Sequence, residues 1–163
     1  AAWARDIYPD ARDALLQEYP WNFAMRRAAL PASTTAPAFG FERAFPLPEA
    51  PEKCLRVWRL EGEPDIEMVW RVEGRQLLTD EAAPLQIHFI AQVTDTAVYA
   101  PLFVEALAAC IAAEGAFHFT GSTSREAQLA ELRRQKVAVA KQMDALEGTP
   151  EDLVANEWLG ARL

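Results

Sequence analysis

The chain has 163 residues, of which 51% are apolar, and a formal net charge of −8. This length and composition allow one domain with a hydrophobic core and exclude a disordered polymer. No apolar run reaches the roughly 18 residues that a membrane-spanning helix needs. Acidic residues outnumber basic ones 24 to 16, which argues against a protein that grips DNA phosphates tightly.

Residues 3–19 carry apolar side chains at helical spacing and predict the first helix. Pro9 removes a backbone hydrogen bond there, so either the helix kinks or a second helix begins at this proline. Pro20 ends the helix. The proline-rich stretch 21–51 is expected to be irregular and pinned to a core by Phe39, Phe41 and Phe45.

Four short apolar or alternating segments follow, at residues 55–60, 66–72, 76–79 and 85–89. Glu73-Gly74 marks a turn between two of them. Because neighbouring short strands separated by turns pair most simply in sequence order, we expect an antiparallel meander over about residues 54–92.

The last part of the chain is predicted to be helical. Residues 99–113 are apolar nearly all round, with Gly115 and Gly121 bracketing the end of this helix. The pattern Thr123-Ser-Arg-Glu126 predicts a capping box that opens the next helix, which Gly148 stops. That helix carries an apolar stripe: Leu129, Leu132, Val139, Met143 and Leu146. Such a stripe is either core packing or a half-exposed seam for a partner.

The fold class that follows is α+β. We expect a mainly α-helical bundle with a small antiparallel β-meander inserted between the N-terminal and C-terminal helices. Residues 1–148 form this body, and residues 149–163 form a C-terminal docking tail.

The residues that usually carry chemistry are sparse and scattered. Cys54 and Cys110 lie among apolar neighbours, which indicates two buried thiols. His88 is expected on the solvated side of its strand, and His118 is expected to be partly buried beside a local partner. The side chains of acidic pairs such as Glu61/Glu63 are expected to be solvated. With no phosphate loop, nucleophile elbow or metal-ligand spacing, we expect no enzyme, no catalytic residue, no cofactor and no metal.

Two features favour contacts with other proteins. Arg133, Arg134, Lys136 and Lys141 form the basic cluster of the predicted last long helix, which either is solvated or pairs with an acidic neighbouring subunit. The C-terminal tail carries side chains that need a place to be buried, either on their own domain or in another subunit. These candidate interface residues are Leu153, Trp158, Leu159, Arg162 and Leu163.

Several segments, in chain order, carry a resemblance to a known family. They are Tyr8-Pro9, Arg12-Asp13, Leu15-Leu16, Tyr19-Pro20-Trp21-Asn22-Phe23-Ala24, Arg26-Arg27-Ala28 with Leu30, Phe45-Pro46-Leu47-Pro48, Cys54-Leu55-Arg56-Val57, Val72-Glu73-Gly74-Arg75 with Leu78-Thr79, the alanine-rich stretch 104–113, Thr120-Gly121-Ser122 and the closing residues 158–162. Together they resemble tail tubular protein A of short-tailed phages. The family usually has a further N-terminal helical segment, so we expect that a segment precedes Ala1. The family pattern also has a small or apolar residue at the place of His118.

The resemblance implies a structural head–tail adaptor, or connector, located in the virion at the head–tail junction and synthesised in the host cytoplasm. Its implied partners are copies of itself in a ring, typically a dodecamer, together with the portal protein and the downstream tail or nozzle protein. Double-stranded DNA would pass through the channel without specific binding, and no membrane would be involved. The resemblance also implies that the C-terminal segment docks against the portal.

Two other function classes remain open from the residues alone. One is a small α+β ligand-binding or enzymatic domain of bacterial origin, using the sheet face of Trp70 and Phe89. The other is a bacterial regulatory module that is monomeric or dimeric.

Overall fold

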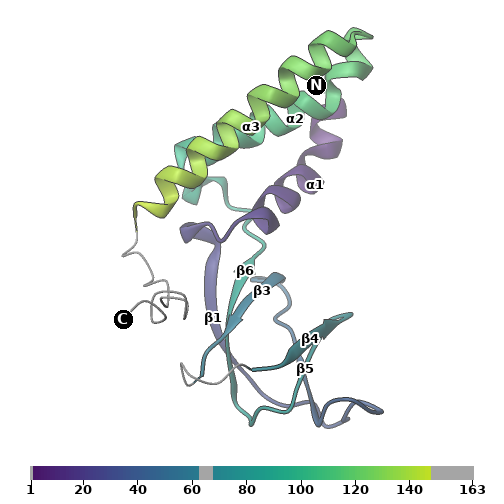
Figure 1. Cartoon of the computed structure of the whole chain (residues 1–163), viewed down its shortest axis with the longest axis vertical. Helices are drawn as coiled ribbons and strands as arrows, with labels where there is room; N and C mark the ends of the chain where they lie inside the picture. The colour runs from purple at the N-terminus through teal and green to yellow at the C-terminus, as the bar shows by residue number, and fades with distance from the viewer. Residues whose placement is uncertain (1, 63–67, 148–163) are drawn as a thin grey trace, which may run out of the picture.

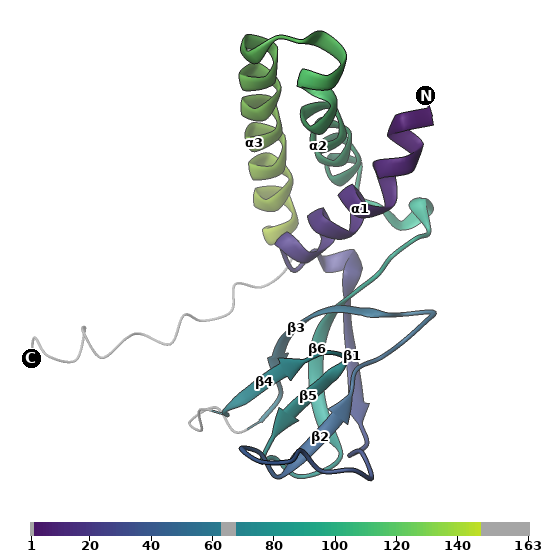
Figure 2. The ribbon, with the colours of Figure 1, turned by 90° about the vertical axis from the view of Figure 1, so that its right-hand side faces the viewer.

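A computed structural model describes residues 2–62 and 68–147 of the chain. Helices gather at one end of an elongated molecule and strands at the other (Figures 1 and 2). Within these residues the α-helices are α1 (Ala2–Glu18), α2 (Pro101–Thr120) and α3 (Thr123–Ala145). The strands are β1 (Met25–Leu30), β2 (Arg43–Pro46), β3 (Cys54–Leu60), β4 (Trp70–Glu73), β5 (Gln76–Thr79) and β6 (Leu85–Ala91). Two short 3₁₀ turns, Asn22–Ala24 and Thr96–Val98, lie between the two parts. The α+β class is therefore confirmed.

The six strands form two three-stranded antiparallel sheets, ordered β1-β6-β3 and β2-β5-β4. The prediction of a single meander was wrong, because β5 and β6 do not pair although they are neighbours in sequence. Only the β4–β5 hairpin follows sequence order, with Gly74 at φ +59° in its turn. The two sheets instead bury their apolar faces against each other, around Phe45, Leu77, Ile87 and Phe89.

Residues 21–51 are not irregular as predicted, because they contain β1 and β2. β1 pairs along its whole length with β6, from Met25 opposite Ile90 to Leu30 opposite Leu85. Its sequence, MRRAAL, shows no apolar alternation because only Leu30 of this strand is buried. This segment forms a strand because its backbone pairs with the strongly apolar β6, and not because of a pattern in its own residues.

α1 runs as one helix through Pro9, whose side chain is exposed, and buries Ala11, Arg12, Leu15 and Leu16. Trp21, which is 1% exposed, anchors the turn that follows. Its indole Nε1 donates to the Leu15 carbonyl oxygen at 2.8 Å. The rings of Phe23 and Phe103 pack against it, and Tyr99 packs against both of these rings, so that the four form part of the core of the helical part.

α2 and α3 form an antiparallel hairpin whose connection differs from the sequence prediction at one point, the N-cap of α3. α2 ends at Thr120, between the two glycines that were expected to bracket its end. Gly115 lies inside the helix and allows a close approach: a Cβ added to Gly115 would lie 2.5 Å from Cη2 of Trp3. The N-cap of α3 is Ser122, one residue before the predicted capping box, and its hydroxyl accepts from the Arg125 amide at 3.3 Å.

Candidate functional site

The apolar stripe of α3 is only partly covered by the rest of the described chain. Leu132, Val139, Met143 and Leu146 are 40, 47, 49 and 71% exposed. They follow one another at steps of seven, four and three residues, so they share one face of the helix. Leu129, the fifth predicted member, is half-buried. The stripe is therefore not part of the core, and of its two interpretations the half-exposed seam fits the structure.

A different face of α3 packs against the rest of the chain. It buries Val137, Ala140 and Asp144. The carboxylate of Asp144 accepts from the backbone amide of Asn22 at 3.1 and 3.2 Å, and the Asn22 side-chain amide donates to the Asp144 carbonyl at 2.7 Å. Burial raises the pKa of Asp144. These bonds tie the end of α3 to the turn that leads into β1.

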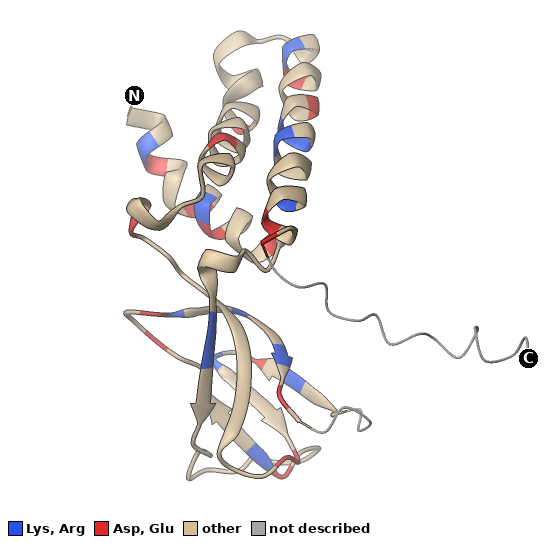
Figure 3. Cartoon of the chain, turned by 90° about the vertical axis from the view of Figure 1, so that its left-hand side faces the viewer, with Lys and Arg blue, Asp and Glu red and all other residues tan. Residues whose placement is uncertain are grey.

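The four cations of the predicted basic cluster are paired within the chain. Arg133 and Lys141 both reach Glu18 of α1, at 3.3 and 2.7 Å. Lys136 contacts Glu105 of α2 at 2.6 Å, and Arg134 pairs with Glu131 of its own helix. Basic and acidic side chains are interspersed along α3 and do not form one continuous basic face (Figure 3).

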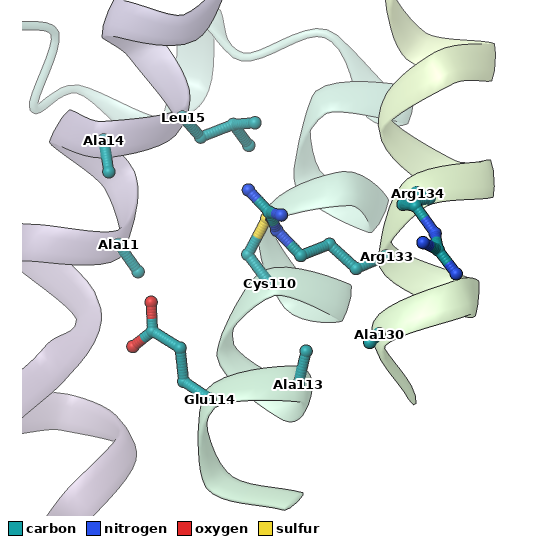
Figure 4. A pocket seen from close by; sticks show the side chains of 9 residues that line it. All are labelled: Ala11, Ala14, Leu15, Cys110, Ala113, Glu114, Ala130, Arg133 and Arg134. Carbon is teal, nitrogen blue, oxygen red and sulfur yellow. The ribbon is translucent and has the colours of Figure 1, made fainter. Parts of the chain in front are cut away.

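A cavity of about 420 Å³ lies among α1, α2 and α3 (Figure 4). Its walls combine small side chains, Ala11, Ala113 and Ala130 among them, with the longer side chains of Leu15 and Glu114. The guanidinium of Arg133 crosses it, and its Nε donates to the Cys110 thiol at 3.3 Å. Since the same guanidinium also pairs with Glu18, its donors serve the contacts between helices.

The two histidines occupy places that differ from those predicted. His88 is only 9% exposed, and its Nε2 lies 2.6 Å from Oε2 of Glu61. It does point away from the core side of β6, as predicted, but Glu61 covers it, so neither residue is simply solvated. His118 is exposed where partial burial was expected, and it stacks on Trp3 at a centroid distance of 6.5 Å.

The remaining candidate residues are the two cysteines and the pair Trp70 and Phe89. Cys54 and Cys110 are both buried free thiols, as predicted, and burial raises the pKa of Cys54 to about 11. Trp70 and Phe89 belong to different sheets and both pack into the core between them, so they form no open ligand face. No three His, Cys, Asp or Glu side chains cluster as metal ligands in residues 2–62 and 68–147.

The predicted interface residues of the tail, Leu153, Trp158, Leu159, Arg162 and Leu163, lie outside the described residues. None of the described helices is long and apolar enough to cross a bilayer. No family model and no curated protein matches this sequence.

Proposed function

We propose that this chain is a structural head–tail adaptor subunit of a tailed phage, which works in a ring beneath the portal. The proposal rests chiefly on the exposed stripe of α3, formed by Leu132, Val139, Met143 and Leu146. The sequence resemblance to tail tubular protein A names the kind of assembly that would cover it. Its place would be the head–tail junction of the virion, after synthesis in the host cytoplasm.

Burying the stripe between copies of the chain would stabilise an assembly at little cost to the isolated fold. Full burial of one leucine-sized side chain contributes about 1.5–3 kcal/mol, and these four side chains have 40–71% of their surface still available. A ring requires each subunit to present two different, complementary surfaces. The stripe is one such surface, and it lies beside ion pairs that are already satisfied within the chain.

The other partners follow from the same proposal. The ring, typically of twelve copies, extends the DNA channel and seats the next tail or nozzle protein. A net charge of −8 suits a channel wall, because a strongly basic lumen would hold the phosphates of passing DNA. Leu153, Trp158, Leu159, Arg162 and Leu163 dock against the portal, since tryptophan and arginine are enriched at interface hot spots.

The stripe is tested by the double variant Leu132→Lys/Val139→Lys, mixed with purified portal protein. Its matched control is Ala138→Lys/Gln142→Lys, which adds the same charge at exposed positions of the same helix. We expect light scattering and negative-stain micrographs to show rings with the wild-type chain and the control, and single subunits with the stripe variant. Rings formed equally by all three proteins would contradict the proposal.

The tail is tested by ending the chain before Trp158. The truncated chain is expected to keep its circular dichroism spectrum and a cooperative thermal transition, because the described core lies within residues 2–147. Binding to immobilised portal should be lost. Docking at full affinity would show that the tail has been assigned wrongly.

A further inference from the structure

An apolar surface that shares Met143 and Leu146 with the stripe lies where the described part of α3 ends. It is a groove of about 220 Å³ between the beginning of α2 and the end of α3. Trp21 and Phe103, both almost fully buried, form its floor, and Leu102, Met143 and Leu146 form its walls. Leu146 is 71% exposed and Met143 49% exposed, so the walls stand open to solvent.

The rim of this groove is negatively charged. Asp144 and Glu147 both line it. The final carbonyl groups of α3 add partial negative charge, as at the C-terminal end of any helix. An occupant that fits would be mainly apolar and would carry a cation at one point.

The last six residues of the chain have this composition. Residues 158–163 include Trp158, Leu159 and Leu163 with one cation, Arg162, whereas the three acids of the segment 148–163, Glu151, Asp152 and Glu157, all precede Trp158. Since Glu147 itself lines the groove, this segment is tethered at the rim. Covalent linkage through a short stretch of chain gives an effective concentration of about a millimolar, so docking needs little intrinsic affinity.

We propose that, in the free subunit, the chain's own C-terminal segment docks into this groove, with Trp158 and Leu159 over the apolar floor and Arg162 at the acidic rim. The inference needs no ring and no portal. It also goes beyond the proposed function, because the side chains assigned there to the portal would first have to leave the groove. The portal and the groove then compete for one segment, and the groove covers Trp158 until assembly.

The test uses the full-length chain with two added cysteines, Met143→Cys in the groove and Ala161→Cys in the segment. The native Cys54 and Cys110 are 1% and 4% exposed and do not compete for mild oxidant. The matched control replaces Met143→Cys by Gln142→Cys, which is exposed on the same helix but does not line the groove. A disulfide forms only when the two Cα atoms approach within about 7 Å, so the reaction reports docking.

At micromolar protein we expect an internal disulfide in the monomer, formed at least about ten-fold faster than in the control pair. Adding Trp158→Ala to the groove pair should reduce this advantage. Equal rates in the two pairs would overturn the proposal. Cross-linked dimers or ladders would overturn it as well, since the occupant would then be the segment of a second copy, while the proposed ring would still stand.

A second measurement covers the case in which the added cysteines disturb folding. The tryptophan fluorescence of the unmodified chain is compared with that of Trp158→Phe in the presence of acrylamide. A docked Trp158 contributes emission that is shielded from the quencher. A difference spectrum as fully quenched as free tryptophan would overturn the inference.

Discussion

The close contact between Gly115 and Trp3 leads to a prediction about stability. In Gly115→Ala the new Cβ would meet Cη2 and Cζ3 of Trp3 at 2.5 and 2.7 Å, so the indole must move. Alanine in place of glycine within a helix contributes about 1 kcal/mol of stability. Displacing a half-buried indole that buries about 100 Å² removes about 2–3 kcal/mol. The net expectation is a loss of about 1–2 kcal/mol.

The two contributions separate in a double-mutant cycle with Trp3→Ala. Without the indole, Gly115→Ala should raise the free energy of unfolding by up to about 1 kcal/mol from helix propensity, because the remaining 3.1 Å contact is with Cδ2 of Phe119, an exposed ring that can move aside. Urea denaturation followed by circular dichroism measures all four proteins. If Gly115→Ala changed stability equally with and without Trp3, the close approach would not be the reason for glycine at this position.

Two further predictions concern the core and the sheet surface. Trp21→Phe leaves the Leu15 carbonyl without its 2.8 Å donor and should lower the free energy of unfolding by about 1–3 kcal/mol. The control is Trp58→Phe, at a 39% exposed position, which should change the free energy of unfolding by less than about 0.5 kcal/mol. The hydrogen bond from His88 lowers the pKa of Glu61 below its ordinary 4.5. The ionised carboxylate therefore stabilises the fold above pH 4.5, and this contribution is lost as the pH falls through the lowered pKa. Glu61→Gln should flatten that acid limb in thermal melts at several pH values, and an unchanged pH dependence would rule the pairing out.

Local sequence patterns predicted the elements that are specified by the residues of their own segment. β3, β5 and β6 were expected close to their observed bounds, because each is a short, mainly apolar segment separated from its neighbours by turn residues. The burial of Cys54 and Cys110 followed in the same way from their apolar neighbours. The helical hairpin was also expected, and its turn lies between Gly115 and the predicted helix start at Thr123, as expected.

The remaining features of the fold depend on contacts between residues that are distant in sequence. β1 has no strand pattern and exists because β6 accepts it as an edge neighbour. The sequence predicts Gly115 near the end of the helix, and only the fold shows that a side chain at this position would meet Trp3. The basic cluster on α3 is apparent in sequence, but only the fold brings Glu18 and Glu105 against Arg133, Lys141 and Lys136.

The sequence by itself determined the α+β class, most of the core strands and the apolar stripe of α3, because each depends on spacing along one segment. It left open whether that stripe is core or surface. The tertiary structure decided this by packing Val137, Ala140 and Asp144 inward, which leaves Leu132, Val139, Met143 and Leu146 exposed. A helical stripe is the same in sequence whichever way it faces, and only the packing of neighbouring elements sets its direction.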